Sequence, residues 1–526
     1  MYKILVSDPL ESTGLEMLRD SGHEVFELPA EERGRLAEII ADYDALVVRS
    51  ATRVTAELLR AGRRLKVVGR AGIGVDNVDV DAATELGILV VNAPTANLIA
   101  ATEHTFAMLL ALARNVPAAD DTMKQGRWDR KKFVGTELQG KTLGVIGLGR
   151  IGQQVARRAQ AFEMTVIAYD PVLDPDSVRR LDVEPMPLAE LLPRADVVTL
   201  HVPLTDETRG LLNRERIAAM KEGALLVNCA RGGVVDEAAL LTALDEGRLA
   251  GAALDVFAQE PPADYELARH PRVVATPHLG AQTHEAQTRI STETARMVLA
   301  ALQGSLAITA VNLPFRPAGP AGVPYLRLAE KLGLLAGHQL EGSLKEVQVA
   351  LWDVDETLHK PIGVAAVKGV LSRYHGDSVN YVNAERVARD RGLKVVRSIH
   401  SEAADYPHLV KVRLAVDGAA VEVAGVLFHD RDPRVVELGG YQLEFQPKGR
   451  LLLVRNRDVP GVVGKVGTAL GDAGVNIAEI HLSRRPGSAE ALAVVRLDQD
   501  VPAAVLDALR KLPEVKRVDL IDLGKL

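Results

Sequence analysis

Short apolar runs alternate with helical or polar stretches along the first half of the chain. Between Met1 and about Pro94 the β-rich runs are YKILVS, HEVFEL, ALVVRS, LKVVGRAG and ILVVNAP. A second series begins at Lys141 and comprises TLGVIGLG, TVIAYD, VVTLHVP, ALLVNCA, GAALDVF and RVVATP. Apolar strands that alternate with helices are typical of parallel sheets covered on both faces. The pattern therefore predicts two α/β units, each a doubly wound, Rossmann-like parallel sheet.

Other patterns mark the helices and the second half of the chain. We expect one long helix from Asn97 to about Gln125 and another from about Gln282 to Gln303. Residues 311–324, VNLPFRPAGPAGVP, are rich in proline and glycine and predict a linker. A mixed α/β region follows and extends to about Gly449. Residues 450–526 then show the order strand, helix, strand, strand, helix, strand, which predicts a ferredoxin-like α+β domain.

Composition and charge argue against several classes of protein. At 526 residues the chain is too long for one core, and a net charge of −7 argues against bulk attraction to nucleic acid or an anionic membrane. The single cysteine, Cys229, cannot form an intrachain disulfide or a cysteine-based metal cluster. The opening residues, MYKILVSDP, lack the features of a signal peptide, and no apolar stretch is long enough to span a membrane. We therefore expect a cytoplasmic protein without a metal, nucleic-acid or membrane partner.

A glycine-rich motif ends the strand TLGVIGLG. Gly147, Gly149 and Gly152 have the spacing GxGxxG, with Arg150 and Ile151 between them, and QQVARRAQAF continues as an amphipathic helix. The first glycine permits a tight turn, the second lets the backbone approach a pyrophosphate, and the third allows close helix–strand packing. The motif alone is a weak signal, because a glycine turn needs no ligand. Its place between a strand and a helix predicts a dinucleotide site.

Asp170 ends the next strand, TVIAYD, where dinucleotide folds carry an acidic residue. Its carboxylate can accept hydrogen bonds from the adenosine ribose hydroxyls. A 2′-phosphate about 5 Å away would be repelled by roughly 3 kcal/mol at an effective dielectric constant near 20. We therefore expect NAD rather than NADP as the cofactor. The alternative is that Asp170 only caps the end of its strand.

Three polar residues follow three strands of the second unit. Arg231 comes after ALLVNCA, Glu260 after GAALDVFAQ and His278 after RVVATP. Open α/β sheets bind their ligands at the carboxyl ends of the strands, so these side chains are expected beside the dinucleotide. A histidine can take the hydroxyl proton of an alcohol, a carboxylate can orient its ring, and an arginine can hold a substrate carboxylate. The set predicts hydride transfer between NAD and a small 2-hydroxy acid.

Each of these three residues also has a simpler interpretation. A histidine between a proline and a leucine is often a hydrogen-bonded turn residue. Arg231 could be a solvated surface cation, and Glu260, before two prolines, a charge at the start of a helix. The functional interpretation depends on three complementary groups at three strand ends beside one cofactor site.

Several phrases of the sequence resemble the D-isomer-specific 2-hydroxyacid dehydrogenase family. They are GRAGIGVDNVD, WDRKKFVGTELQGKTLGVIGLGRIG, VNCARGGVVDE, ALDVFAQEPP and TPHLGAQTHEAQ. The likeness covers essentially the whole chain, including VNYVNAERVARDRGL. It is greatest to the members that oxidise 3-phospho-D-glycerate to 3-phosphooxypyruvate, the first step of phosphorylated L-serine biosynthesis. The resemblance implies that Arg231, Glu260 and His278 are catalytic, with His278 as proton donor and acceptor.

The resemblance also implies cofactor contacts and a domain division. Counting the three motif glycines, the expected cofactor contacts are Gly147, Gly149, Arg150, Ile151, Gly152, Asp170, Cys229, Ala230, Arg231, Asp255, His278, Leu279, Gly280 and Ala281. Ile73 and Val202 are expected to be lesser contacts. The implied domains are 1–95 with 281–314 for substrate binding, 96–280 for NAD, 315–449 as an intervening domain and 450–526 as an ACT regulatory domain.

A phosphorylated substrate requires cations. The expected substrate contacts are Arg49, Arg130, Lys131 and Lys132 for the phosphate, the backbone N–H groups of Arg70, Ala71 and Gly72 for the carboxylate, and Asn97. In the family such a basic run can reach the site of a neighbouring subunit. The alternative for residues 130–132 is a solvated surface run.

The last domain resembles the ACT domain, a small-molecule sensor that commonly pairs across subunits. In the family the positions that match Asp458 and Asn476 bind L-serine, so L-serine is the expected effector and a homotetramer the expected assembly. An aspartate can pair with an ammonium group, and an asparagine amide can both donate and accept hydrogen bonds. The alternative is that Asp458 caps a helix and Asn476 shapes a turn.

Two other functions are compatible with the sequence. A glyoxylate or hydroxypyruvate reductase would share the fold and the three catalytic residues, but not the long C-terminal extension. An NAD-sensing corepressor or scaffold would use the fold to bind a partner, and the intact set of Arg231, Glu260 and His278 argues against it.

Overall fold

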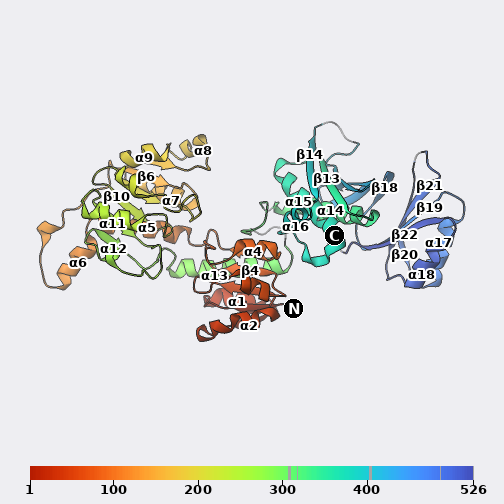
Figure 1. Cartoon of the computed structure of the whole chain (residues 1–526), viewed down its shortest axis with the longest axis horizontal. Coiled ribbons are helices and arrows are strands. Elements are labelled where there is room, and N and C mark those ends of the chain that lie inside the picture. The colour runs from red at the N-terminus through yellow and green to blue at the C-terminus, as the bar shows by residue number, and fades with distance from the viewer. Residues whose placement is uncertain (306–309, 317, 402–404, 486, 525–526) are drawn as a thin grey trace.

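The computed structural model describes residues 1–305, 310–316, 318–401, 405–485 and 487–524. Four units, each built on one sheet, follow one another along the long axis of the molecule (Figure 1). The second sheet lies at one end, the first sheet in the middle, and the two C-terminal sheets at the other end. The first two sheets bury apolar clusters of their own, whereas one cluster extends from the third sheet onto one face of the fourth, and a further cluster lies on the other face of the fourth sheet.

The first sheet is parallel, with strand order β2-β1-β3-β4-β5. All five predicted runs form strands, which are β1 Lys3–Val6, β2 Glu24–Glu27, β3 Ala45–Val48, β4 Val67–Arg70 and β5 Leu89–Asn92. Alternate strand residues pack on two layers of helices: α2 Leu36–Ile39, α3 Ala56–Ala61 and α4 Val80–Glu85 on one face, and α1 Ser12–Asp20 and α13 His284–Leu302 on the other. Gly69 permits the approach of α13, because a Cβ there would lie 2.4 Å from Val298. A helix distant in sequence therefore completes this core.

The second sheet is also parallel, with strand order β12-β11-β10-β9-β6-β7-β8. Its strands are β6 Thr142–Ile146, β7 Thr165–Tyr169, β8 Glu184–Pro185, β9 Val197–Leu200, β10 Leu225–Asn228, β11 Gly251–Leu254 and β12 Val273–Ala275. One face is covered by α5 Leu98–Ala113, α7 Arg150–Ala161 and α8 Pro175–Arg179, the other by α9 Leu188–Arg194, α10 Arg214–Ala218, α11 Glu237–Asp245 and α12 Glu266–Arg269. The strand order reverses between β6 and β9, which places a ligand crevice at their carboxyl ends.

The prediction of one helix from Asn97 to Gln125 is wrong. The helix ends at Ala113, and a second helix, α6, spans Val116–Lys124. Asn115 between them adopts a left-handed backbone conformation, with φ of 55°. Pro117, at the second position of α6, lacks the N–H that a continuous helix would use there. The short 3-10 helix η3, Arg130–Lys132, follows α6.

The third sheet is mixed, with strand order β14-β13-β15-β16-β17-β18. Its strands are β13 Leu344–Trp352, β14 Lys394–His400, β15 Val410–Val416, β16 Ala419–Phe428, β17 Asp432–Leu438 and β18 Tyr441–Phe445, and its helices are α14 Gly319–Gln339, α15 Glu356–His375 and α16 Ala384–Asp390. The predicted linker is too long, because α14 already begins at Gly319. Pro320 is tolerated in the first turn, where the N–H groups need no helical partner. Helices α14 and α15 pack closely, since a Cβ at Gly333 would lie 2.2 Å from the Ala366 carbonyl oxygen.

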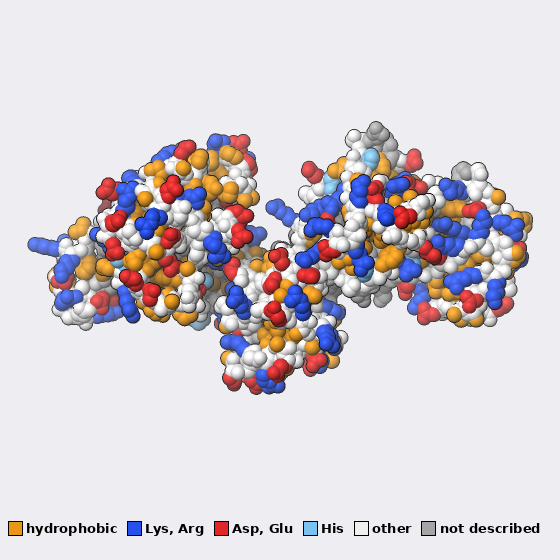
Figure 2. All heavy atoms as spheres, in the orientation of Figure 1, with side chains coloured by type: hydrophobic (Ala, Val, Ile, Leu, Met, Phe, Trp, Pro, Cys, Tyr) orange, Lys and Arg blue, Asp and Glu red, His pale blue; other side chains and the backbone are white. Residues whose placement is uncertain are grey.

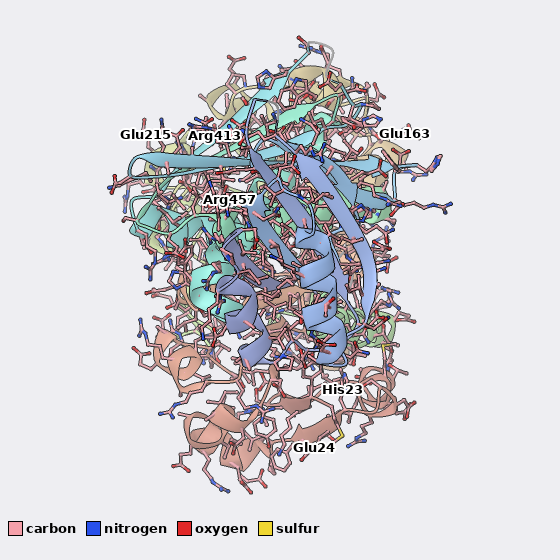
Figure 3. All side chains as sticks on the ribbon, turned by 90° about the vertical axis from the view of Figure 1, so that its right-hand side faces the viewer. His23, Glu24, Glu163, Glu215, Arg413 and Arg457 are labelled. Carbon is pink, nitrogen blue, oxygen red and sulfur yellow. The ribbon has the colours of Figure 1, made fainter. Side chains whose placement is uncertain are left out.

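The fourth sheet is antiparallel, with strand order β20-β21-β19-β22. Its strands are β19 Arg450–Arg457, β20 Ile477–Arg484, β21 Glu490–Leu497 and β22 Val515–Asp522, and its helices are α17 Val462–Asp472 and α18 Ala503–Arg510. The predicted ferredoxin-like order is confirmed. Both helices share one core with the sheet and stand in front of it in Figure 3. None of the helices in the described part of the chain has the length and apolarity that a membrane span requires.

Candidate active site

The glycine motif forms an open turn between β6 and α7. Gly147 has a φ of 91°, and a Cβ at Gly152 would lie 2.1 Å from the Gly147 carbonyl oxygen, so both positions require glycine. Gly149 caps α7 without a side-chain hydrogen bond, and a Cβ there would meet no atom within 4 Å. The first N–H groups of the helix therefore face open space, the arrangement that binds a phosphate. These residues fit a dinucleotide.

Asp170 caps the turn between β6 and α7. Its carboxylate accepts backbone N–H groups from Leu148 at 2.8 Å, Val172 at 2.8 Å and Leu173 at 3.1 Å. Asp170 therefore does act as a cap, as the alternative interpretation of the sequence predicted. An ionised carboxylate has about four acceptor positions, so three such bonds leave room for a ribose hydroxyl.

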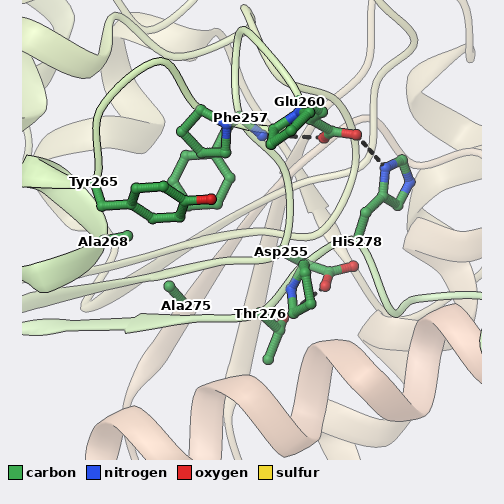
Figure 4. A pocket seen from close by; sticks show the side chains of 11 residues that line it. Asp255, Phe257, Glu260, Tyr265, Ala268, Ala275, Thr276 and His278 are labelled. Atoms are coloured by element: carbon green, nitrogen blue, oxygen red, sulfur yellow. Dashed lines mark hydrogen bonds and ion pairs between the residues drawn. The ribbon is translucent and has the colours of Figure 1, made fainter.

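Glu260 and His278 form a hydrogen-bonded pair beyond β11 and β12. His278 Nδ1 lies 2.7 Å from Glu260 Oε2, and Glu260 Oε1 accepts the N–H of Phe257 at 3.2 Å. Figure 4 shows the imidazole and the carboxylate pointing toward each other at the edge of a cavity. His278 has a φ of 56°, a conformation that is uncommon outside glycine. The surrounding backbone therefore has to hold this loop in place.

The pair shifts the pKa of both groups toward the charged forms. The hydrogen bond with Glu260 raises the pKa of His278, against burial, which lowers it. Burial raises the pKa of Glu260, but the hydrogen bond and the charge of His278 outweigh it, so the net shift is downward. The imidazole can therefore hold a proton above its usual range, as a group that both accepts and donates a proton needs to do.

Arg231, after β10, lies between the first two sheets. Its Nε is 3.1 Å from Asp76 Oδ2, in the loop after β4, and its Nη1 donates to the Ala230 carbonyl oxygen at 2.7 Å. Gly74 leaves space for the guanidinium, since a Cβ there would lie 2.1 Å from Nη2. Nη2 is thus directed at the loop after β4. Asp76 is not among the residues predicted from the sequence, although the phrase GRAGIGVDNVD contains it.

Two further arginines lie near Arg231. Burial, and then the charges of Arg231 and Arg49, lower the pKa of Arg70 to about 10, so Arg70 still carries its charge at neutral pH. Arg49 donates to Gln287 at 2.6 Å. Asn97 Oδ1 is buried without a hydrogen-bond partner. Arg49 and Arg70 therefore place positive charge at the ends of β3 and β4, and Asn97, at the start of α5, has an unpaired acceptor.

The basic run of η3 lies apart from Arg49, Arg70 and Arg231 of the same chain. Lys132 pairs with Asp129 at 3.3 Å, and the run follows α6, which projects at the far end of the molecule (Figure 1). Figure 2 shows acidic and basic side chains interspersed over the visible face.

The remaining predicted cofactor residues follow the carboxyl ends of strands in the first two sheets. Asp255 accepts the backbone N–H groups of Leu279 and Gly280, and burial raises the pKa of the Cys229 thiol to about 12. Three of the other positions form hydrogen bonds: Arg150 Nη1 donates to the Pro94 carbonyl oxygen, and the carbonyl oxygens of Ile73 and Ala281 accept from the side chains of Asn92 and Gln287. Two others pack on apolar neighbours or backbone: Val202 lies near Gly147, and Ile151 lies on the α5 side of the sheet. Asp170, Cys229 and Asp255 thus directly follow β7, β10 and β11 at the carboxyl edge of one parallel sheet.

A cavity of about 410 Å³ adjoins the Glu260–His278 pair. Its wall includes Asp255 and an apolar group made of Phe257, Pro261, Pro262, Tyr265, Ala268, Ala275 and Pro277 (Figure 4). This apolar wall was not predicted from the sequence, although the phrase ALDVFAQEPP spans part of it. Among the described residues no group of three or more His, Cys, Asp or Glu side chains is arranged to hold a metal ion.

Asp458 and Asn476 are not brought together within one chain. Asp458 follows the end of β19, and Asn476 precedes the start of β20. Both strands pair antiparallel with β21, so they run parallel to each other, and these two positions lie at opposite ends of the sheet, roughly 25 Å apart. Asp458 pairs with Arg484 at 2.8 Å, and Asn476 donates to Asp498 at 2.6 Å. Asp458 and Asn476 of the same chain therefore do not form one site together.

Comparison with known proteins places this geometry in a family. The NAD-binding domain of D-isomer-specific 2-hydroxyacid dehydrogenases matches residues 106–280, the D-3-phosphoglycerate dehydrogenase intervening domain matches 323–439, and the ACT domain matches 450–514. D-3-phosphoglycerate dehydrogenase of Methanocaldococcus jannaschii is 44% identical over 99% of this chain and 100% of its own. The chain belongs to the D-isomer-specific 2-hydroxyacid dehydrogenase family.

Solved members of the family cover the first part of this dehydrogenase. D-lactate dehydrogenase of Aquifex aeolicus, solved with NAD and lactic acid, is 33% identical, with a TM-score of 0.52, over 58% of this chain and 96% of its own. A glyoxylate reductase of Paecilomyes thermophila is 30% identical, with a TM-score of 0.55, over 59% of this chain and 98% of its own. The chain is thus an NAD-dependent oxidoreductase with an added intervening domain and an ACT domain.

Proposed function

We propose that the enzyme oxidises 3-phospho-D-glycerate to 3-phosphooxypyruvate with NAD, the first step of phosphorylated L-serine biosynthesis. The observation that carries this proposal is the extent of the likeness. A relative named for this activity matches 99% of the chain, intervening and ACT domains included, whereas the lactate and glyoxylate enzymes match 58% and 59%. A glyoxylate or hydroxypyruvate reductase accounts for less of the chain. A corepressor or scaffold has no use for the Glu260–His278 pair.

In this proposal each residue of the site has a separate task. His278 takes the C2 hydroxyl proton at Nε2, because Nδ1 is engaged by Glu260. Glu260 orients the ring and supports its positive charge. Arg231 anchors the substrate carboxylate with the Nη2 side of its guanidinium. NAD, when bound, accepts the C2 hydride.

The cofactor and the substrate use different parts of the crevice. The glycine motif, Asp170, Asp255 and residues 278–281 hold NAD. Arg49 and Arg70 attract the anionic substrate, with the backbone of residues 70–72 for its carboxylate and Asn97 as an acceptor for a hydroxyl group. Residues 130–132 reach the phosphate only from a second subunit, because they lie on an arm that projects away from their own crevice.

We further propose a domain division for this reaction. Residues 1–95 with 281–314 form the substrate-binding domain, 96–280 the NAD-binding domain, 315–449 the intervening domain and 450–526 the ACT domain. The packing of α13 on the first sheet supports the discontinuous first domain.

Regulation by L-serine requires two ACT domains. Asp458 of one copy and Asn476 of another can meet if two domains pair side by side through β20. This edge strand carries Ile480 and Leu482 half-exposed, and an apolar edge strand favours pairing with a second chain. We therefore propose a homo-oligomer, a tetramer, that works in the cytoplasm and is inhibited by L-serine.

Initial rates of NADH formation test the substrate. The purified enzyme is assayed with NAD and 3-phosphoglycerate, glycerate or lactate. We expect kcat/KM for 3-phosphoglycerate to exceed that for glycerate by about a hundredfold, since a charged hydrogen bond contributes about 1.5–3 kcal/mol and the phosphate forms more than one. Equal values for the two substrates would contradict the assignment.

The ratio of the rates with and without L-serine tests the regulation. Asp458→Ala and Asn476→Ala should each lose the response. A co-refolded mixture of the two variants should regain part of it, because one intact site forms in each mixed pair. No recovery in mixtures shown to exchange subunits would contradict the two-chain site.

A further inference from the structure

Four donors converge on the buried carboxylate of Asp255, which is 1% exposed. Oδ1 accepts from Thr276 Oγ1 at 2.6 Å and from the Leu279 N–H at 2.7 Å, and lies 3.0 Å from His104 Nε2. Oδ2 accepts from the Gly280 N–H at 2.9 Å. Oδ1 is therefore fully used by the protein, whereas Oδ2 keeps one acceptor position for a ligand.

The residues that donate to Asp255 from this loop lie on both sides of His278 in the sequence. Thr276 precedes it by two residues, and Leu279 and Gly280 follow it directly. The His278 N–H itself donates to the Asp255 carbonyl oxygen at 2.9 Å. Because His278 has a positive φ, its conformation costs energy and persists only where the surroundings impose it. Asp255 is the residue that imposes it.

His104 connects this loop to a rigid element. It lies on α5 and is 17% exposed, and its Nε2 lies 3.0 Å from Asp255 Oδ1 and 3.2 Å from Thr276 Oγ1. Because Thr276 already donates to Asp255, both neighbours accept, so this nitrogen carries the hydrogen. One helical turn later, Met108 Sδ lies 3.6 Å from Thr276 Oγ1. The helix therefore contacts the loop through two side chains on one face.

We propose that His104 is a positioning residue of the dehydrogenase: its hydrogen bond to Asp255 holds residues 276–280 in the conformation that presents His278 to Glu260. His104 touches neither the catalytic pair nor the predicted substrate contacts. It acts indirectly, because it holds the carboxylate of Asp255, and Asp255 in turn holds residues 276–280. The proposal rests on the proposed function of His278, and its first test below needs neither substrate nor cofactor.

The electrostatics of the cluster agree with this role. Burial raises the pKa of Asp255, but hydrogen bonds from His104, from Thr276 and from the Leu279 N–H outweigh it, so the net shift is downward. The Asp255 charge helps Glu260 to raise the pKa of His278, which Arg231 lowers. Cys229 also faces Asp255, as a neutral thiol. Loss of the His104 donor therefore weakens the support of a protonated His278 in two ways, through charge and through geometry.

The first experiment measures hydrogen exchange in the free protein. His104→Leu removes the donor and keeps most of the volume, whereas His104→Gln keeps an N–H at a similar distance. His270→Gln is the matched control, because His270 pairs with Asp245 in the same domain, at 3.4 Å, away from the crevice. We expect the amides of Thr276 and of residues 278–282 to exchange about tenfold faster in His104→Leu, the effect of leaving a buried acceptor without one donor. His104→Gln and His270→Gln should exchange like the wild type.

The second experiment measures the pH dependence of NAD reduction by 3-phosphoglycerate. In His104→Leu we expect kcat to fall about tenfold, as a slightly misplaced catalytic group predicts. The acid limb should also move to lower pH, because a less supported His278 loses its proton more readily. His104→Gln should restore both quantities.

Two results would overturn the proposal. One is wild-type exchange at residues 276–282 in His104→Leu. The other is equal loss of activity and melting temperature in His104→Leu and His104→Gln with no shift of the pH limb, which indicates a general structural role. If the exchange results hold but no variant oxidises 3-phosphoglycerate, the proposed substrate is wrong and the positioning role stands.

Discussion

His278 Nδ1 lies 2.7 Å from Glu260 Oε2, so Nε2 is the ring nitrogen that remains to face a substrate. Glu260→Gln keeps the size of the side chain but removes the charge that raises the pKa of His278. Oxidation needs the neutral ring and is lost as pH falls through this pKa. Reduction needs the protonated ring and is lost as pH rises through it.

We therefore expect both limbs to move to lower pH in Glu260→Gln, with a fall in kcat of about a hundredfold. Profiles of kcat/KM in the two directions measure this. A reduced rate with unmoved limbs would show that Glu260 does not set the protonation of His278.

Arg231→Lys tests the carboxylate anchor. A lysine keeps the charge and can still reach Asp76, but it loses the planar pair of donors. We expect KM for 3-phosphoglycerate to rise about tenfold or more, while the dissociation constant of NADH, measured by fluorescence titration, changes little. An unchanged KM would remove Arg231 from the substrate site.

Asp170→Asn tests the choice of cofactor. The variant keeps an acceptor for the backbone N–H groups around Asp170 but removes the charge that repels a 2′-phosphate. We expect the ratio of kcat/KM for NADP to that for NAD to rise by about ten- to a hundredfold. Asparagine has only one side-chain oxygen, so some of the bonds to these N–H groups are lost, and the melting temperature measures the effect of that loss on stability. No change in the ratio would mean that discrimination lies elsewhere.

The thiol of Cys229 should be inert in the folded protein. Its pKa of about 12 leaves almost no thiolate at pH 8, and the side chain is only partly exposed. We expect a disulfide reagent to titrate one thiol in denaturant and almost none in the native enzyme within minutes. Rapid native labelling would contradict the raised pKa of this thiol.

Local patterns predicted the strands and the glycine motif, because each depends on neighbours in sequence. The runs YKILVS to ILVVNAP form β1 to β5, and Gly147 to Gly152 form the turn that their spacing predicts. The break at Asn115 and the early start of α14 at Gly319 went unpredicted, because one left-handed residue or one tolerated proline decides them.

Long-range contacts could not be predicted from the sequence. Asp76 and Arg231 are 155 positions apart, and nothing local indicates that a loop of the first sheet carries the partner of a residue in the second. Likewise His104 occupies an apolar helix, and only the packing of α5 on the second sheet brings it to Asp255. The opposite placement of Asp458 and Asn476 follows from the strand order rather than from either phrase.

The most direct test of the account is the turnover of His278→Ala, measured beside its affinity for NADH. His284→Ala is the control, since His284 is exposed at the start of α13, six positions along the chain. We predict that kcat with 3-phosphoglycerate falls by about two to four orders of magnitude in His278→Ala, with NADH still bound and the control unaffected. Turnover of His278→Ala near that of the wild type would contradict the account.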